Sequence, residues 1–297
     1  MPAPVPSCGR RRRRKRELEN FVFIAVLFAA LCHAGWNALI KVGLDPLSTT
    51  TLIVAGATVF ALVAVPFVPL PAAVSWPYLV ASSFIHLFYF AGLAEAYRTG
   101  DLGQVYPIAR GSAPLMTAVA GTIVVGEPLG ILAWCGIVAL AFGVLLLSLR
   151  GGRDLKLDRR AVGFALFTAV TICVYTVVDG VGARLAGNPV SYVLWGFIGI
   201  CICLVPYALW RNGRSLFADL GHFWQRGLAG GALQVVSYGI ALWAMTLAPI
   251  AIVASLRETS VLFGAVIAVV VLKEPLRTTR IAAALLIVCG LILIRIH

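Results

Sequence analysis

The segment VYPIARGSAP, residues 105–114, places Arg110 in an apolar stretch between Pro107 and Pro114. A side chain that is always charged is costly at membrane depth, so it normally faces protein or a water-filled cavity. Its planar guanidinium group suits a carboxylate, phosphate or phosphonate. We therefore expect Arg110 to bind an anionic group in a cavity, or else to join helices through an ion pair.

A second arginine lies at a matching position later in the chain. Two apolar runs end in the related turns Gly126-Glu127-Pro128-Leu129 and Lys273-Glu274-Pro275-Leu276, and counting back equally from the two glutamates reaches Arg110 and Arg257. The same offset pairs Leu115 with Leu262 and Gly143 with Gly290. This register indicates a tandem duplication in which the two arginines hold equivalent places.

Other polar and aromatic side chains recur at steps of three or four residues in apolar runs, so each set shares one helix face. With the two arginines, the candidates for a substrate site are His33, Asn37, His86, Tyr89, Tyr106, Tyr175, Gln234 and Tyr238. The alternative for Asn37 is a hydrogen bond to a neighbouring helix, and tyrosines near the ends of spans suit the interfacial belt.

Each acidic residue of the runs has more than one candidate role. Asp179 is expected to cap its helix, to pair with Arg184, or to be the partner of Arg257. Glu127 and Glu274 could carry protons, but each precedes a proline at a span boundary. Because a glutamate there complements the dipole of the helix that follows, we expect a capping role for both.

Composition places the chain in a bilayer. Of 297 residues, 61% are hydrophobic and only 12% are charged, with a mean hydropathy of +0.96. The net charge of +12 depends on Arg10–Arg16, a basic run next to the first apolar run. Such a run typically contacts anionic lipid, so nucleic acid is not the expected partner. The seven cysteines show neither a disulfide framework nor metal-ligand spacing, and no metal or cofactor is expected.

Ten apolar runs of membrane-spanning length divide into five and five. They cover about 21–40, 47–69, 75–97, 102–125 and 129–149, then 161–182, 189–210, 227–247, 249–272 and 277–296. The predicted organisation is a basic tail (1–20), a first repeat (21–149), a charged linker (150–160) and a second repeat (161–297). Because five is odd, the second repeat enters the membrane from the opposite side. The expected fold is an all-α integral membrane protein with two inverted five-helix repeats around a central cavity.

A five-helix unit that ends in Gly-Glu-Pro-Leu and recurs with Lys-Glu-Pro-Leu resembles the EamA-type transporters of the drug/metabolite transporter superfamily. The strings HAGWN (33–37) and VYPIARG (105–111) further resemble a subgroup linked to phosphonate use. The segment Pro66–Pro77 departs from the pattern, because it lacks the basic residues that many relatives carry there.

The resemblance implies a multi-pass carrier or exporter of a small metabolite, most simply in a bacterial inner membrane, with a proton or another ion as a candidate for coupling. The basic tail favours cytoplasmic termini, although the loops at 150–160, 211–226 and 273–280 also carry basic residues. A lipid-carrier flippase is the alternative. An integral-membrane enzyme is disfavoured because the chain shows no metal-ligand spacing, no Gly-x-Ser-x-Gly elbow and no phosphate loop.

Overall fold

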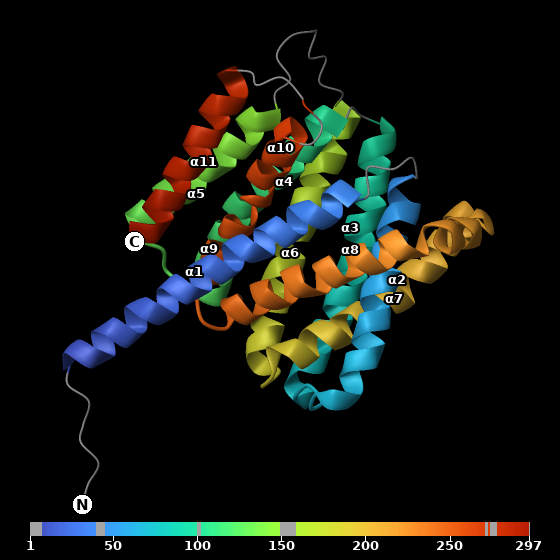
Figure 1. The fold of residues 1–297 in the computed structure, drawn as a ribbon, viewed down its shortest axis with the longest axis horizontal. Coiled ribbons are helices and arrows are strands. Elements are labelled where there is room, and N and C mark those ends of the chain that lie inside the picture. Colours follow the sequence, from blue (N-terminus) through green and yellow to red (C-terminus); the bar gives the residue numbers. More distant parts are fainter. Residues whose placement is uncertain are drawn as a thin grey trace, which may run out of the picture.

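The computed structural model describes residues 8–39, 45–99, 102–148, 159–270, 273 and 278–296. Within these residues every regular element is a helix, and the helices cross one another at steep angles (Figure 1). The all-α prediction is confirmed. Glu274 with its Pro-Leu turn and the side chain of Tyr106 lie outside the described part of the chain.

The first half contains five long helices. They are α1 (Cys8–Leu39), α2 (Pro46–Ala64), α3 (Trp76–Thr99), α4 (Leu102–Ala120) and α5 (Ile131–Ser148), with 3₁₀ turns at Val65–Phe67 and Ala73–Ser75 and a π turn at Gly121–Val125. The second half contains α6 (Arg159–Leu185), α7 (Pro189–Asn212), α8 (Ser215–Met245), α9 (Ile250–Arg257), α10 (Ser260–Val270) and α11 (Thr278–Ile296). The helix α6 thus begins inside the linker predicted at 150–160.

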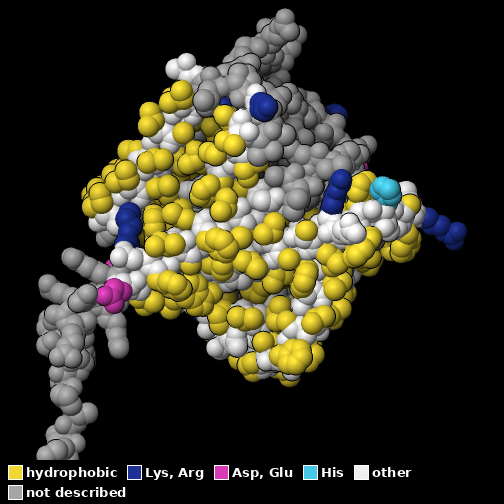
Figure 2. Space-filling model, in the orientation of Figure 1, with side chains coloured by type: hydrophobic (Ala, Val, Ile, Leu, Met, Phe, Trp, Pro, Cys, Tyr) yellow, Lys and Arg dark blue, Asp and Glu magenta, His cyan; other side chains and the backbone are white. Residues whose placement is uncertain are grey.

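Most of the described helices are long and apolar enough to cross a membrane. Nine segments meet this description, among them Ile250–Ile267, in which α9 and α10 together form one crossing, and α5 adds a shorter apolar helix. Phe21, Ile24 and Phe28 of α1 are each more than half exposed and lie on one face of that helix. Hydrophobic side chains cover much of the described surface in Figure 2, with few charges among them. This surface suits lipid, and the chain is a multi-pass membrane protein.

The second helix of each half begins in the same way. Asp45 precedes Pro46 and accepts hydrogen bonds from the next backbone N–H groups of α2, and Asn188 precedes Pro189 and does the same for α7. A short polar side chain satisfies N–H groups that have no partner inside the helix, and proline suits the first turn. The two halves therefore share local start signals as well as a motif.

The packing of the helices relates the halves by an approximate twofold operation. In the first half α1 contacts α8, α9 and α10, and in the second half α6 contacts the corresponding α3 and α4. Each of α2 and α5 packs on its own counterpart, α7 and α11 respectively. Exchanging the halves leaves this pattern unchanged. With five crossings in each half, the repeats are inverted, as the register of the two arginines predicts.

Glycines allow α5 and α11 to pack closely at this approximate axis. A Cβ atom on Gly143 would lie 2.6 Å from Ile287 Cγ1, and one on Gly290 would lie 2.6 Å from the Gly136 oxygen and 2.8 Å from the Leu140 nitrogen. Leu140 and Ile287 are equivalent under the repeat offset, so the two contacts mirror each other. Small residues of this kind let helix backbones approach closely in membranes.

The fourth span of each half differs in continuity. The helix α4 contains Pro107 and Pro114, yet it continues as one helix from Leu102 to Ala120. The break lies in the equivalent span of the second half, where α9 ends at Arg257 and α10 begins at Ser260. Glu258 and Thr259 donate their backbone N–H groups to carbonyls three residues back, which ends the α-helical pattern without proline.

Glu127 performs a different capping function from the one predicted. Its Oε2 accepts a hydrogen bond of 2.8 Å from the Ile250 N–H at the start of α9, and its Oε1 pairs with Arg184 Nη2 at 2.5 Å. Glu127 therefore caps a helix of the other repeat instead of the helix that follows it. Arg184 also donates to the carbonyls of Met245 and Ala248, so it pairs with Glu127 and not with Asp179.

We predict that Gly290→Ala destabilises the protein, because the new methyl group would meet backbone atoms of α5 that cannot move independently. An overpacked contact of this kind costs about 1–3 kcal/mol. Gly163→Ala in α6 is the matched control, because its Cβ would meet no atom within 4 Å. Thermal unfolding in detergent should show a lower midpoint only for Gly290→Ala. Equal midpoints for the two variants would contradict the close packing of α5 and α11.

Candidate functional site

Arg110 lies at a junction of the two repeats. Its Nε is 3.2 Å from Glu258 Oε2, and its Nη2 donates to His33 Nε2 at 2.8 Å and to Ser260 Oγ at 3.2 Å. Arg110 and Glu258 are 8% and 5% exposed, so the ion pair is buried. Because the arginine donates to Nε2, that nitrogen is the acceptor and His33 is neutral. One guanidinium group thus connects α4, α1 and the break between α9 and α10.

The break between α9 and α10 positions Glu258 for this contact. In an unbroken helix, adjacent side chains point about 100° apart. Glu258 and Thr259 form the turn after Arg257, and there Glu258 faces Arg110 while Ser260 starts α10 and accepts from the same guanidinium. The arginine therefore has a counter-ion from the opposite repeat.

A small cavity adjoins the ion pair. The residues that line it are Arg110, Ala113, Pro114 and Thr117 from α4, Ile172, Tyr175 and Thr176 from α6, and Ala254, Arg257 and the C-terminal Glu258 from α9. It has about 290 Å³ of empty space, part of it open, but room for little more than a water molecule at any one point. A metabolite would require the helices to separate further. Both repeat-equivalent arginines line this cavity, together with one carboxylate and three neutral hydroxyl groups.

The two arginines differ in their partners. Among the described residues, Arg257 Nε has no hydrogen-bond acceptor although the atom is buried, and its guanidinium carbon lies 5.3 Å from the centre of the Tyr238 ring. No carboxylate of the described residues lies within 4.0 Å of its nitrogens, so the expected ion pair between Arg257 and Asp179 is not formed. Of the two arginines that line the cavity, Arg257 is therefore the one without a carboxylate partner among the described residues.

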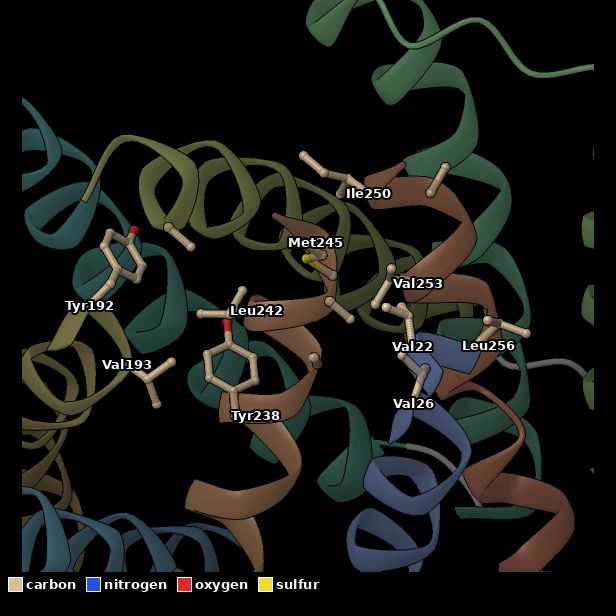
Figure 3. Close-up of a cluster of buried hydrophobic side chains, with 14 of the residues drawn as sticks. Val22, Val26, Tyr192, Val193, Tyr238, Leu242, Met245, Ile250, Val253 and Leu256 are labelled. Carbon is tan, nitrogen blue, oxygen red and sulfur yellow. The ribbon is translucent and has the colours of Figure 1, made fainter. Parts of the chain in front are cut away.

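Asp179 instead binds two tyrosines. Its Oδ1 accepts from Tyr192 at 3.0 Å, and its Oδ2 accepts a short hydrogen bond from Tyr238. Figure 3 shows both tyrosines projecting from α7 and α8 into the same buried region, beside Leu242 and Val193. The predicted site residue Tyr238 thus contacts two charged side chains. Its hydroxyl bonds the Asp179 carboxylate, and its ring lies under the Arg257 guanidinium.

Three further predicted residues form an aromatic group next to the cavity. The ring of His86 stacks on Tyr175 with centroids 4.2 Å apart, and the ring of Tyr89 meets the edge of Tyr175 at 5.6 Å. His86 Nδ1 lies 2.9 Å from the Ser82 carbonyl oxygen, so this nitrogen carries a proton and donates it. Tyr175, four residues before Asp179 on α6, therefore connects the aromatic group to the cavity wall.

Of the predicted residues that the structure describes, three line the cavity: Arg110, Tyr175 and Arg257. Four more each contact one of these three: His33, His86, Tyr89 and Tyr238. Asn37 and Gln234 do not line the cavity. The side-chain amide of Asn37 donates to the His33 carbonyl of its own helix at 2.8 Å, so it bonds within α1 and not to a neighbouring helix. Gln234 Oε1 is buried without a hydrogen-bond partner among the described residues, but Gln234 does not line the cavity. Both stay predictions as substrate ligands.

The residues that the sequence did not identify as site members are Thr117, Thr176, Asp179, Glu258 and Ser260. Glu258 was recognisable only as a possible counter-charge beside Arg257, because helical geometry argued against a contact and the break was not foreseen. Threonine and serine occur widely in such helices and bond their own backbone, as Thr117 does with Ala113. Only three-dimensional proximity distinguishes them. Among the described residues, no group of three or more His, Cys, Asp or Glu side chains is placed to hold a metal ion.

We predict that Arg110→Gln lowers the free energy of unfolding by about 3–5 kcal/mol, because it leaves Glu258 buried without its counter-ion. The double variant Arg110→Gln with Glu258→Gln should regain most of this loss, since two neutral amides can bond each other. Unfolding in detergent of both single variants and the double variant completes the cycle. If Arg110→Gln alone were as stable as the wild type, the ion pair would not stabilise the fold.

Comparisons with known proteins agree with this architecture. Comparison with curated protein sequences gives no significant match. A solved structure described only as "Crystal structure of protein" superposes with a TM-score of 0.71 at 16% identity, over 93% of this chain and 96% of the other, which supports the fold alone. The model of the EamA-like transporter family matches residues 20–149 and 159–296, one match for each half. The chain therefore belongs to the EamA-like transporter family and is a membrane transporter of the drug/metabolite superfamily.

Proposed function

We propose that the protein is a secondary transporter of a small polar metabolite, anionic or zwitterionic, that binds in the cavity between Arg110 and Arg257. The observation that carries this proposal is the pair of repeat-equivalent arginines on one cavity, of which Arg257 has a buried Nε and, among the described residues, no carboxylate within 4.0 Å. Guanidinium groups suit carboxylates and phosphates. Glu258 could receive the positive end of a zwitterion.

Alternating access is the mechanism that this architecture supports. In a protein with inverted repeats, each repeat can adopt the arrangement of the other. This gives two related conformations, with the substrate site at the interface between the repeats. The cavity is too narrow for a metabolite as it stands, so binding requires the helices around it to move apart. The broken span is suited to such motion, because α9 and α10 can reorient about Glu258 and Thr259 without disrupting a continuous helix.

The charged lining of the cavity favours a polar metabolite over a lipid. Its present space holds little more than a water molecule and so does not discriminate between the two. Its charged groups suit a polar solute, whereas a lipid carrier needs an apolar path for acyl chains. Membership of a transporter family agrees with a protein that is not an enzyme. We place it in a bacterial inner membrane with both termini cytoplasmic, the orientation that the basic tail favours.

The transport prediction uses Arg257→Gln, because no carboxylate of the described residues lies within 4.0 Å of this arginine and the substitution breaks no ion pair among them. Purified protein in proteoliposomes is offered a radiolabelled panel of small carboxylates, phosphonates and amino acids. We expect the wild type to accumulate at least one anionic or zwitterionic member, and Arg257→Gln to lose that uptake while its unfolding midpoint changes little.

Arg226→Gln is the matched control for charge, because Arg226 also lies over an aromatic ring, that of Phe223, but on the exposed part of α8. It should transport at the wild-type rate. Uptake by Arg257→Gln that equals the wild type would remove Arg257 from the substrate site. Scrambling of fluorescent lipid without uptake of any panel member would instead favour the flippase.

A further inference from the structure

Asp179 is the most completely enclosed carboxylate of the described helices that has no arginine as its partner. It is 2% exposed and lies on α6 where this helix meets α7 and α8. Each carboxylate oxygen accepts one phenol hydrogen bond, from Tyr192 and from Tyr238. The two phenols solvate the group but supply no positive charge.

Two other carboxylates, one buried and one partly exposed, have arginine partners. Glu258 pairs with Arg110, and Glu127 pairs with Arg184. No lysine or arginine nitrogen of the described residues lies within 4.0 Å of Asp179. Because an ionised carboxylate without a counter-ion is expensive at membrane depth, a proton is the alternative source of neutrality.

Titratable or charged side chains around Asp179 come from every helix that packs on α6. They are His86 from α3, Arg110 from α4, Tyr192 from α7, Tyr238 from α8, and Arg257 with Glu258 from α9, while Tyr175 and Arg184 share its own helix. The short turns Ala73–Ser75 and Gly121–Val125, which also touch α6, contribute no titratable side chain. His33, which bonds Arg110, is neutral.

The formal charges of this group balance as it stands. Arg110 and Arg257 supply two positive charges, and Glu258 and ionised Asp179 supply two negative charges. An anion that enters the cavity would leave one negative charge in excess, in a region that solvates charge poorly. A zwitterion would leave none. Binding of an anion therefore requires one further positive charge from the protein or the solvent.

We propose that Asp179 is a proton-binding site of the transport cycle: its buried carboxylate takes up one proton from water when an anion occupies the arginine cavity, and releases it on the side where the anion leaves. This inference rests on the proposed function for its link to transport. Tyr238 connects the two sites, because its hydroxyl bonds Asp179 while Arg257 covers its ring. Glu258 remains ionised because Arg110 holds it.

Infrared difference spectroscopy tests the proton site without knowledge of the substrate. The reconstituted wild-type protein is titrated with acid, and the carbonyl stretch of a protonated, buried carboxyl group is followed. We expect a band that is absent from Asp179→Asn and retained by Glu258→Gln. Glu95→Gln is a control on a paired, partly exposed carboxylate and should also retain the band.

Tyr192→Phe provides a second variant should Asp179→Asn fold poorly, because it preserves the carboxyl group and the ring but removes one hydrogen-bond donor. The band should persist and shift in frequency. A wild-type spectrum without such a band throughout the titration, or a band that survives in Asp179→Asn, would overturn the assignment. A band that disappears in Glu258→Gln would move the proton to Glu258 and likewise overturn it.

Coupling is measured in the proteoliposomes described above, with and without a pH gradient. For a transported monocarboxylate such as lactate, the gradient should accelerate uptake by the wild type and have no effect on Asp179→Asn. Uptake of alanine, a zwitterion of similar size, should not respond in either protein. If no panel member is transported, the proposed function fails while the infrared result still decides whether Asp179 binds a proton. Gradient-driven lactate uptake that persists in Asp179→Asn would refute the coupling role.

Discussion

The buried ion pair between Arg110 and Glu258 is the interaction on which the centre of this protein depends. A guanidinium group at membrane depth requires a counter-charge and acceptors for its remaining N–H groups. Glu258 supplies the charge, and His33 and Ser260 supply acceptors. These contacts come from both repeats, so the charge is compensated only when the two repeats pack together. The break in the ninth span lies at Glu258, the residue that supplies the counter-charge.

The short helix α9 is held by the first repeat at both of its ends. Glu127 accepts from the N–H of Ile250 at its start, and Arg110 pairs with Glu258 just after its end. Eight residues of α-helix span only about 12 Å, so the two contacts define the position of α9 against α4 and α5. A movement of α9 relative to the first repeat would alter at least one of these contacts.

The two repeats are related in backbone but not in chemistry. Arg110 and Arg257 hold equivalent places, yet the residue after Arg110 is Gly111 while the residue after Arg257 is Glu258. Gly111 allows α4 to pass close to α5, where a Cβ atom would lie 2.7 Å from Leu145 Cγ. Glu258 instead neutralises the opposite arginine. Arg110 thus has a carboxylate partner, whereas Arg257, on the same cavity, has none among the described residues. A symmetric scaffold with an asymmetric site can bind a substrate that is itself asymmetric.

The sequence by itself determined the membrane class, the ten spans and the inverted duplication, because hydropathy over about 20 residues and a repeated Arg-to-Glu-Pro register are local or counting properties. It also indicated Arg110, Arg257, His33 and Tyr175, since polar groups in apolar runs are expensive enough to be conspicuous. Only the tertiary structure decided the partners. Arg110 pairs with Glu258 at a helix break that contains no proline. Glu127 caps a helix of the other repeat, and Asp179 binds two tyrosines instead of an arginine. Such pairings depend on which faces of distant helices meet, and spacing along one helix carries no information about that.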